Sequence, residues 1–127
     1  MHAEILMYMG LICAIRSKYD EALKVYDTIK IDTPALRERR AFVLWKLRIM
    51  NKAIQVIESL EASHDETPEI MEIKAECELA NKHAKRAEQC REKAAQLYSN
   101  RLRGGMSSKN GFNPEVMEDL NDLLRLN

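Results

Sequence analysis

A pair of small residues recurs in three successive segments of this chain. In each segment one small residue stands in a first predicted helix, and the other stands early in the next. The pairs are Gly10 with Ala22, Ala41 with Ala53, and Ala75 with Ala87. Ala53 and Ala87 are 34 residues apart. Small side chains let two helices cross closely, so the pattern predicts a repeating stack of helix pairs.

Composition indicates that the whole chain is all-α. Only 4 glycines and 3 prolines occur in 127 residues, while strong helix formers such as Ala, Leu, Glu, Lys and Arg dominate. Apolar residues recur at helical spacing between the few breakers. The predicted helices span 3–16, 19–31, 34–48, 51–62, 68–80 and 82–98.

The pattern divides the chain into a repeat domain, a linker and a last helix. Gly104 and Gly105 open a stretch rich in turn-forming residues, "GGMSSKNGFN", which is typical of a flexible linker. Asn113 is then a good N-cap before Pro114. We expect the last helix either to cap the repeats or to dock into their groove. The predicted parts are a repeat domain at 1–102, with repeats at about 3–34, 35–68 and 69–99, a linker at 103–113, and a helix at 114–127.

Charge and cysteine content restrict the partners and the compartment. The formal net charge is zero, so no overall field draws the chain to nucleic acid or to an anionic membrane. The apolar run at 5–15 is too short to cross a bilayer. The 3 cysteines form no C-x-x-C motif, which is typical of reduced thiols. We therefore predict a cytoplasmic protein without membrane insertion.

No pattern in the sequence supports catalysis. The 3 histidines have no cysteine or carboxylate at metal-ligand spacing, and no glycine-rich phosphate loop or nucleophile elbow is present. We predict that the protein is not an enzyme and that it needs no metal and no cofactor.

The spacing resembles the tetratricopeptide repeat (TPR), whose pattern is W-x2-L-G-x2-Y, then A-x3-F, then P. The first unit reads Leu6-x2-Met9-Gly10-x2-Cys13, then Ala22-x3-Tyr26, then Pro34. The second and third units keep the small residues and depart elsewhere, for example at Arg37 and Arg40. The resemblance implies about three antiparallel helix pairs in a right-handed superhelix. Its structural positions are Gly10, Ala22, Tyr26, Pro34, Ala41, Ala53, Ala75 and Ala87.

The resemblance also implies that the first helix of each pair lines a concave groove. The groove positions in this sequence are Met7, Leu11, Ala14, Glu38, Phe42, Trp45, Glu72, Glu76 and Leu79. One end is therefore apolar and the other acidic, which suits an amphipathic helix or extended peptide with basic flanks. Some relatives clamp acidic chaperone tails with basic residues here, and this chain lacks that clamp.

Two functions follow from this groove and from the ends of the stack. The first is an adaptor or chaperone that holds a segment of another protein, as the small type III secretion chaperones of this repeat family do. The second is a scaffold segment of a longer TPR protein in a multi-subunit assembly. A scaffold segment should expose Ile5, Leu6, Met9 and Ile12 and should self-associate. Self-association is also expected through residues 114–126.

Overall fold

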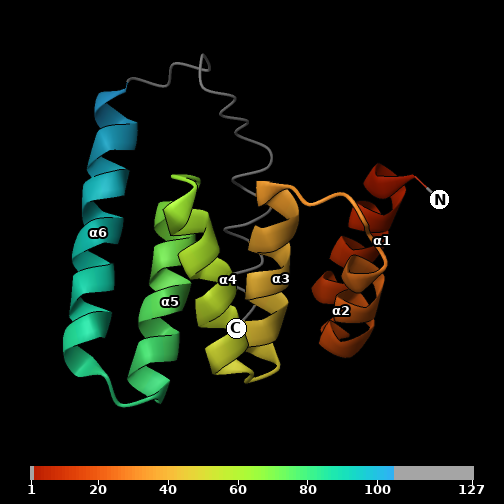
Figure 1. Cartoon of the computed structure of the whole chain (residues 1–127), viewed down its shortest axis with the longest axis horizontal. Coiled ribbons are helices and arrows are strands. Elements are labelled where there is room, and N and C mark those ends of the chain that lie inside the picture. Colours follow the sequence, from red (N-terminus) through yellow and green to blue (C-terminus); the bar gives the residue numbers. More distant parts are fainter. Residues whose placement is uncertain (1, 105–127) are drawn as a thin grey trace.

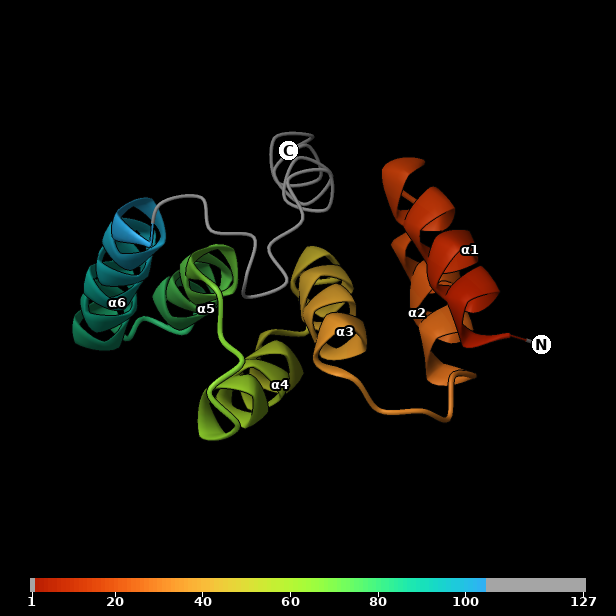
Figure 2. The same cartoon turned by 90° about the horizontal axis from the view of Figure 1, so that it is seen from above.

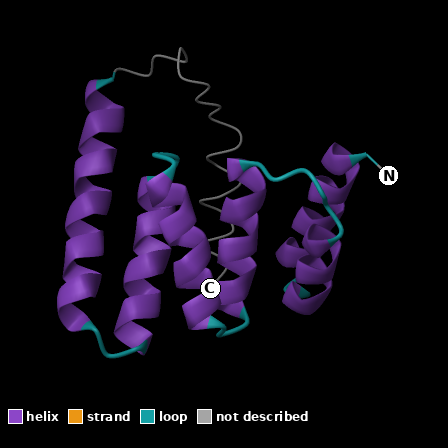
Figure 3. Cartoon of the chain, in the orientation of Figure 1, coloured by secondary structure: helices purple, strands orange, loops and turns teal. Residues whose placement is uncertain are grey.

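The computed structural model of the protein describes residues 2–104, which form six α-helices and no strand (Figures 1 and 3). The predicted helix at 114–127 and most of the predicted linker lie outside these residues. The helices are α1 (Ala3–Ile15), α2 (Tyr19–Asp27), α3 (Pro34–Lys46), α4 (Met50–Ala62), α5 (Pro68–Ala80) and α6 (Ala84–Arg103). The prediction of an all-α helical repeat is thereby confirmed.

The helices pack as three consecutive pairs. α1 packs on α2, α3 on α4, and α5 on α6. The pairs are joined through contacts of α2 with α3 and of α4 with α5, and the view from above shows them following one another in a row (Figure 2). α3 also contacts both α1 and α5. The first helices of neighbouring pairs therefore adjoin one another.

The turn within each pair is built in the same way three times. Each first helix has 13 residues, and three residues separate it from its partner helix. The middle residue of each turn has a left-handed backbone: Ser17 (φ 61°), Arg48 (φ 66°) and Lys82 (φ 64°). The next amide donates a hydrogen bond to a carbonyl five residues earlier, as in Lys18 N to Cys13 O at 2.8 Å. This turn satisfies the carbonyls at the end of each first helix.

The spacing of the pairs is 31 residues and then 34, rather than a uniform 34. α1, α3 and α5 begin at residues 3, 34 and 68. The first pair is shorter because α2 ends at Asp27, whereas the sequence predicted a helix to 31. Three of the four residues at 28–31 are β-branched, namely Thr28, Ile29 and Ile31, which favours the extended chain that leads to α3. The Thr28 hydroxyl donates to the Val25 carbonyl at 2.6 Å, which helps to close α2.

The helices that begin each later pair have matching start signals. Thr33 precedes Pro34, and its hydroxyl accepts the Leu36 amide at 3.2 Å; Thr67 precedes Pro68 and accepts the Ile70 amide at 3.3 Å. A threonine N-cap followed by proline at the first helical position is a strong start for a helix. The last described helix, α6, runs to Arg103, five residues beyond the predicted end, and has Gly104 as its C-cap.

The small residues of the repeat pattern are all buried. Ala22, Ala41, Ala53, Ala75 and Ala87 are fully or almost fully buried. Gly10 is buried against Tyr26: a Cβ on Gly10 would lie only 2.2 Å from the Tyr26 ring. The crossing of α1 and α2 at Gly10 therefore has no room for a side chain.

We expect Lys82→Gly to stabilise the protein by about 0.5–1 kcal/mol, because glycine adopts the left-handed backbone without the strain of a Cβ. The matched control is Glu88→Gly on the exposed face of α6, where glycine should cost about 1 kcal/mol. Urea unfolding followed by circular dichroism measures both. Equal destabilisation by the two substitutions would contradict a left-handed turn at Lys82.

Candidate protein-binding site

A cavity of about 370 Å³ lies where α3, α5 and α6 meet. Trp45 of α3, Glu72 and Glu76 of α5, and Arg91 of α6 line it together with Ile73. The Ile73 side chain is buried, whereas Glu72, Glu76 and Arg91 are exposed. The cavity is therefore lined by the indole ring of Trp45 and the buried Ile73, and it has two carboxylates at its margin.

Trp45 is held by an aromatic cluster that we define as Tyr19, Phe42 and Trp45. The Phe42 ring packs edge-on against both others, with centroid distances of 6.2 Å to Tyr19 and 5.9 Å to Trp45. The Lys46 ammonium lies 4.9 Å from the Trp45 ring centroid, and 5.9 Å and 6.0 Å from those of Tyr19 and Phe42. Partial desolvation lowers the pKa of Lys46. Packing on one side and the cation on another fix the orientation of the indole.

The structure brings together only part of the predicted groove. Trp45, Glu72 and Glu76 share the cavity. Met7 and Leu11 are half-buried and pack against the core, whereas Ala14 and Phe42 are buried, with 2% of Phe42 exposed. Of these two rings, that of Trp45 lines the cavity and that of Phe42 does not. Leu79, near the end of α5, is exposed.

Glu38, also predicted in the groove, is half-buried next to a second acidic side chain. The pKa of Glu38 is raised to about 7, first because burial disfavours its charged form and then because Glu69 repels it. Glu69 is fully buried, and its carboxylate accepts two hydrogen bonds from the Arg101 guanidinium, at 2.7 Å and 3.1 Å. Arg101 balances the charge of Glu69 and leaves Glu38 as the carboxyl that holds a proton near neutral pH.

The Arg101 side chain also covers the Tyr98 ring, at 5.6 Å from its centroid. Burial raises the pKa of Tyr98 to about 12, with further contributions from Glu69 and Glu72. Glu72 therefore interacts with the Tyr98 hydroxyl and also lines the cavity. The acidic end of the predicted groove is connected in this way to the last turns of α6.

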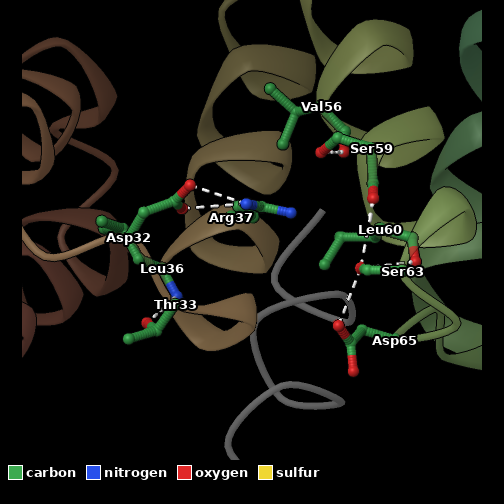
Figure 4. A network of polar contacts seen from close by, with 9 residues as sticks. All are labelled: Asp32, Thr33, Leu36, Arg37, Val56, Ser59, Leu60, Ser63 and Asp65. Atoms are coloured by element: carbon green, nitrogen blue, oxygen red, sulfur yellow. Dashed lines mark hydrogen bonds and ion pairs between the residues drawn. The ribbon is translucent and has the colours of Figure 1, made fainter.

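A different, more polar cavity of about 420 Å³ lies among the α2–α3 connection, α3 and α4. Figure 4 shows its principal contact, in which the Arg37 guanidinium donates to both Asp32 oxygens at 2.9 Å and 2.6 Å. Arg40 pairs with Asp27 at 3.1 Å. Each of these two guanidinium groups has its own carboxylate, so the contacts link α3 to α2 and to the α2–α3 connection rather than forming an anion site.

On α4, α5 and α6 a further ion-pair network cross-links the helices. Glu61 accepts from Lys74 at 2.6 Å and from Lys93 at 2.8 Å, and Lys93 also lies 3.5 Å from Glu66. Glu61, Lys74 and Lys93 come from three helices and Glu66 from the α4–α5 connection, so the network joins the second pair to the third.

Sequence reasoning missed Lys46, Arg91 and Arg101 as parts of the site. Lys46 stands four residues after Phe42, a facing position on α3, and its long stem also brings the ammonium to the Trp45 ring. Arg91 and Arg101 come from α6, whereas the predicted groove used first helices only. Arg91 stands at the last position of the A-x3-F spacing in the third unit, and this was the one sequence signal that pointed to it.

Within residues 2–104 no helix has the length and apolar content to cross a membrane, and no group of three metal-ligating side chains occurs. Cys77 and Cys90 are buried thiols, and burial raises the pKa of Cys77 to about 12. No family model, no curated protein and no solved structure matches the chain. The fold itself defines the class, which is an all-α helical-repeat protein.

Proposed function

We propose that this protein is a tetratricopeptide-type module that binds a segment of another protein and acts in the cytoplasm as an adaptor or chaperone. The main support is the cavity that Trp45 lines together with Glu72 and Glu76. Tryptophan is the residue most enriched at binding hot spots, and it binds best where neighbouring groups exclude water. The three identical turns support the repeat family independently of the side chains.

The chemistry of the cavity favours a partner that is apolar in its centre and basic at its flanks. The Trp45 ring offers an apolar surface, and Glu72 and Glu76 offer carboxylates, of which Glu76 lies 3.7 Å from Arg91. That distance is long for a salt bridge between two exposed side chains, so it contributes little. A basic side chain of the partner can therefore compete for Glu76. The small type III secretion chaperones, which shield apolar helices of client proteins, are the parallel at the level of the fold.

We expect Glu72→Lys with Glu76→Lys to weaken the binding of a basic-flanked peptide about tenfold, because attraction at the cavity margin becomes repulsion. The probe is an amphipathic peptide of about 16 residues without tryptophan, carrying lysines at both ends. Trp45 is the only tryptophan, so its fluorescence reports binding directly. The matched control is Glu88→Lys with Glu92→Lys, an equal charge change at the same spacing on the exposed face of α6.

The same peptide with glutamates at its ends is the second arm of this experiment. We expect it to bind the native protein more weakly than the lysine form. Equal binding of the two peptides, or equal loss in the two double variants, would contradict a site that selects basic flanks.

A specific observation favours a second function, that of a scaffold segment in a multi-subunit assembly. The outer face of α1 leaves Ile5, Met9 and Ile12 exposed, as expected for a helix that contacts another protein, while Leu6 is half-buried. In that case binding partners would remain associated when Glu72 and Glu76 are reversed and would be lost on changes in α1.

A further inference from the structure

The α1 helix carries an apolar stripe that no described part of the chain covers. Its members are separated by three, four and three residues and have 48–68% of their surface exposed: Ile5, Tyr8, Ile12 and Ile15. Met9, beside them, is 40% exposed. α1 lies at one end of the row of helices (Figures 1 and 2), and its opposite side packs on α2. The stripe therefore faces away from the rest of the repeats.

The spacing of the stripe is that of a coiled-coil seam. Alternating steps of three and four residues keep four side chains on one line of a helix, as the a and d positions of a heptad do. The pattern is symmetric about residue 10. When α1 meets a second α1 running in the opposite direction, Ile5 lies across from Ile15 and Tyr8 lies across from Ile12. The apolar face of α1 is therefore complementary to the same face of a second copy.

The charges at the two ends of α1 complement each other in the same arrangement. Glu4 lies in the first turn, and Arg16 and Lys18 follow the last turn. None of these three has an ion pair within residues 2–104. The antiparallel arrangement that aligns the stripe brings Glu4 of one copy to the basic end of the other, twice per pair. A parallel arrangement would place like charges together.

We propose that the protein forms a homodimer through an antiparallel α1–α1 contact. A twofold axis at the middle of α1 makes the interface isologous and closed, so association stops at two copies. One helix per copy is a small interface beside the roughly 1,600 Å² of a standard stable complex, so the dimer dissociates in the micromolar range. It lies on α1 and leaves the Trp45 cavity open, so it does not depend on the proposed function.

The test is sedimentation equilibrium of the full chain from about 1 to about 200 µM. The expected mass rises from 14.7 kDa to twice that value and goes no further. Tyr8→Lys with Ile12→Lys should weaken dimerisation at least about tenfold. Ile31→Lys with Leu102→Lys, at two other exposed apolar residues, should leave it unchanged. Circular dichroism and thermal unfolding confirm that each variant is folded.

A charge swap tests the antiparallel orientation. Glu4→Arg and Arg16→Glu should each weaken the dimer about threefold to tenfold, and the two changes together in one chain should restore most of the affinity. A mass of 14.7 kDa at every concentration overturns the proposal, and so do masses above two copies. A dimer that persists in Tyr8→Lys with Ile12→Lys assigns the contact to another surface and overturns it too. Absence of rescue in the charge swap rejects the antiparallel pairing.

Discussion

Replacing Gly10 by alanine is expected to destabilise the protein by about 3 kcal/mol, although the same change inside an ordinary helix would stabilise it by about 1 kcal/mol. The sign reverses because the new Cβ would lie 2.2–2.7 Å from three atoms of the Tyr26 ring. Tyr26 has 1% of its surface exposed, so the ring has no free space into which it can move. Either α1 shifts away from α2 or the ring leaves its position. Urea unfolding measures the loss.

The control for Gly10→Ala is the same substitution in a Tyr26→Leu background. Tyr26→Leu alone leaves a cavity and should cost about 2–4 kcal/mol. In that background Gly10→Ala has room for its methyl group, and its own cost should fall to about zero or change sign. The coupling between the two positions is then about 3 kcal/mol. If Gly10→Ala costs the same in both backgrounds, the helix crossing is not limited by contact between Gly10 and Tyr26.

The pairwise repeat was predictable because it depends on local signals that recur. Proline at 34 and 68 after a threonine, and small residues at fixed offsets, each have a direct backbone or packing consequence. The end of α2 was not predictable in the same way. Residues 28–31 continue an apolar pattern at helical spacing, but Ile29 packs against the core from a non-helical backbone. Periodicity alone does not distinguish these two cases.

The candidate site was predictable only for residues that share one face of a single helix. Glu72 and Glu76 are one turn apart on α5 and reach the same cavity as Trp45. Phe42 was placed on the same surface, but it is buried against Tyr19 of the preceding pair. Its burial depends on how two pairs pack, and the sequence of one pair does not contain that information. The Glu69–Arg101 contact joins residues 32 apart and depends on α6 continuing past its predicted end.

The second large effect concerns Glu38, whose pKa is raised from 4.5 to about 7 by burial and by the nearby Glu69 carboxylate. Between these two values the folded protein holds a proton that the unfolded chain has already lost. Linkage then requires stability to fall as the pH rises from about 4.5 to about 7. A shift of this size corresponds to about 3 kcal/mol, and about 2 kcal/mol remains after allowance for solvent screening of a half-buried group.

Glu38→Gln should remove this pH dependence, because glutamine stays neutral at every pH. The variant is expected to differ little from the native protein at about pH 5 and to be more stable by about 2 kcal/mol at about pH 8. Urea unfolding at both pH values gives this difference, and comparison of two proteins cancels the titration of every other group. Glu92→Gln, on the exposed face of α6, should give no such difference. A gain for Glu38→Gln that is the same at both pH values would mean that the Glu38 carboxyl is ionised throughout, and that Arg39 and Arg101 outweigh its burial and the repulsion by Glu69.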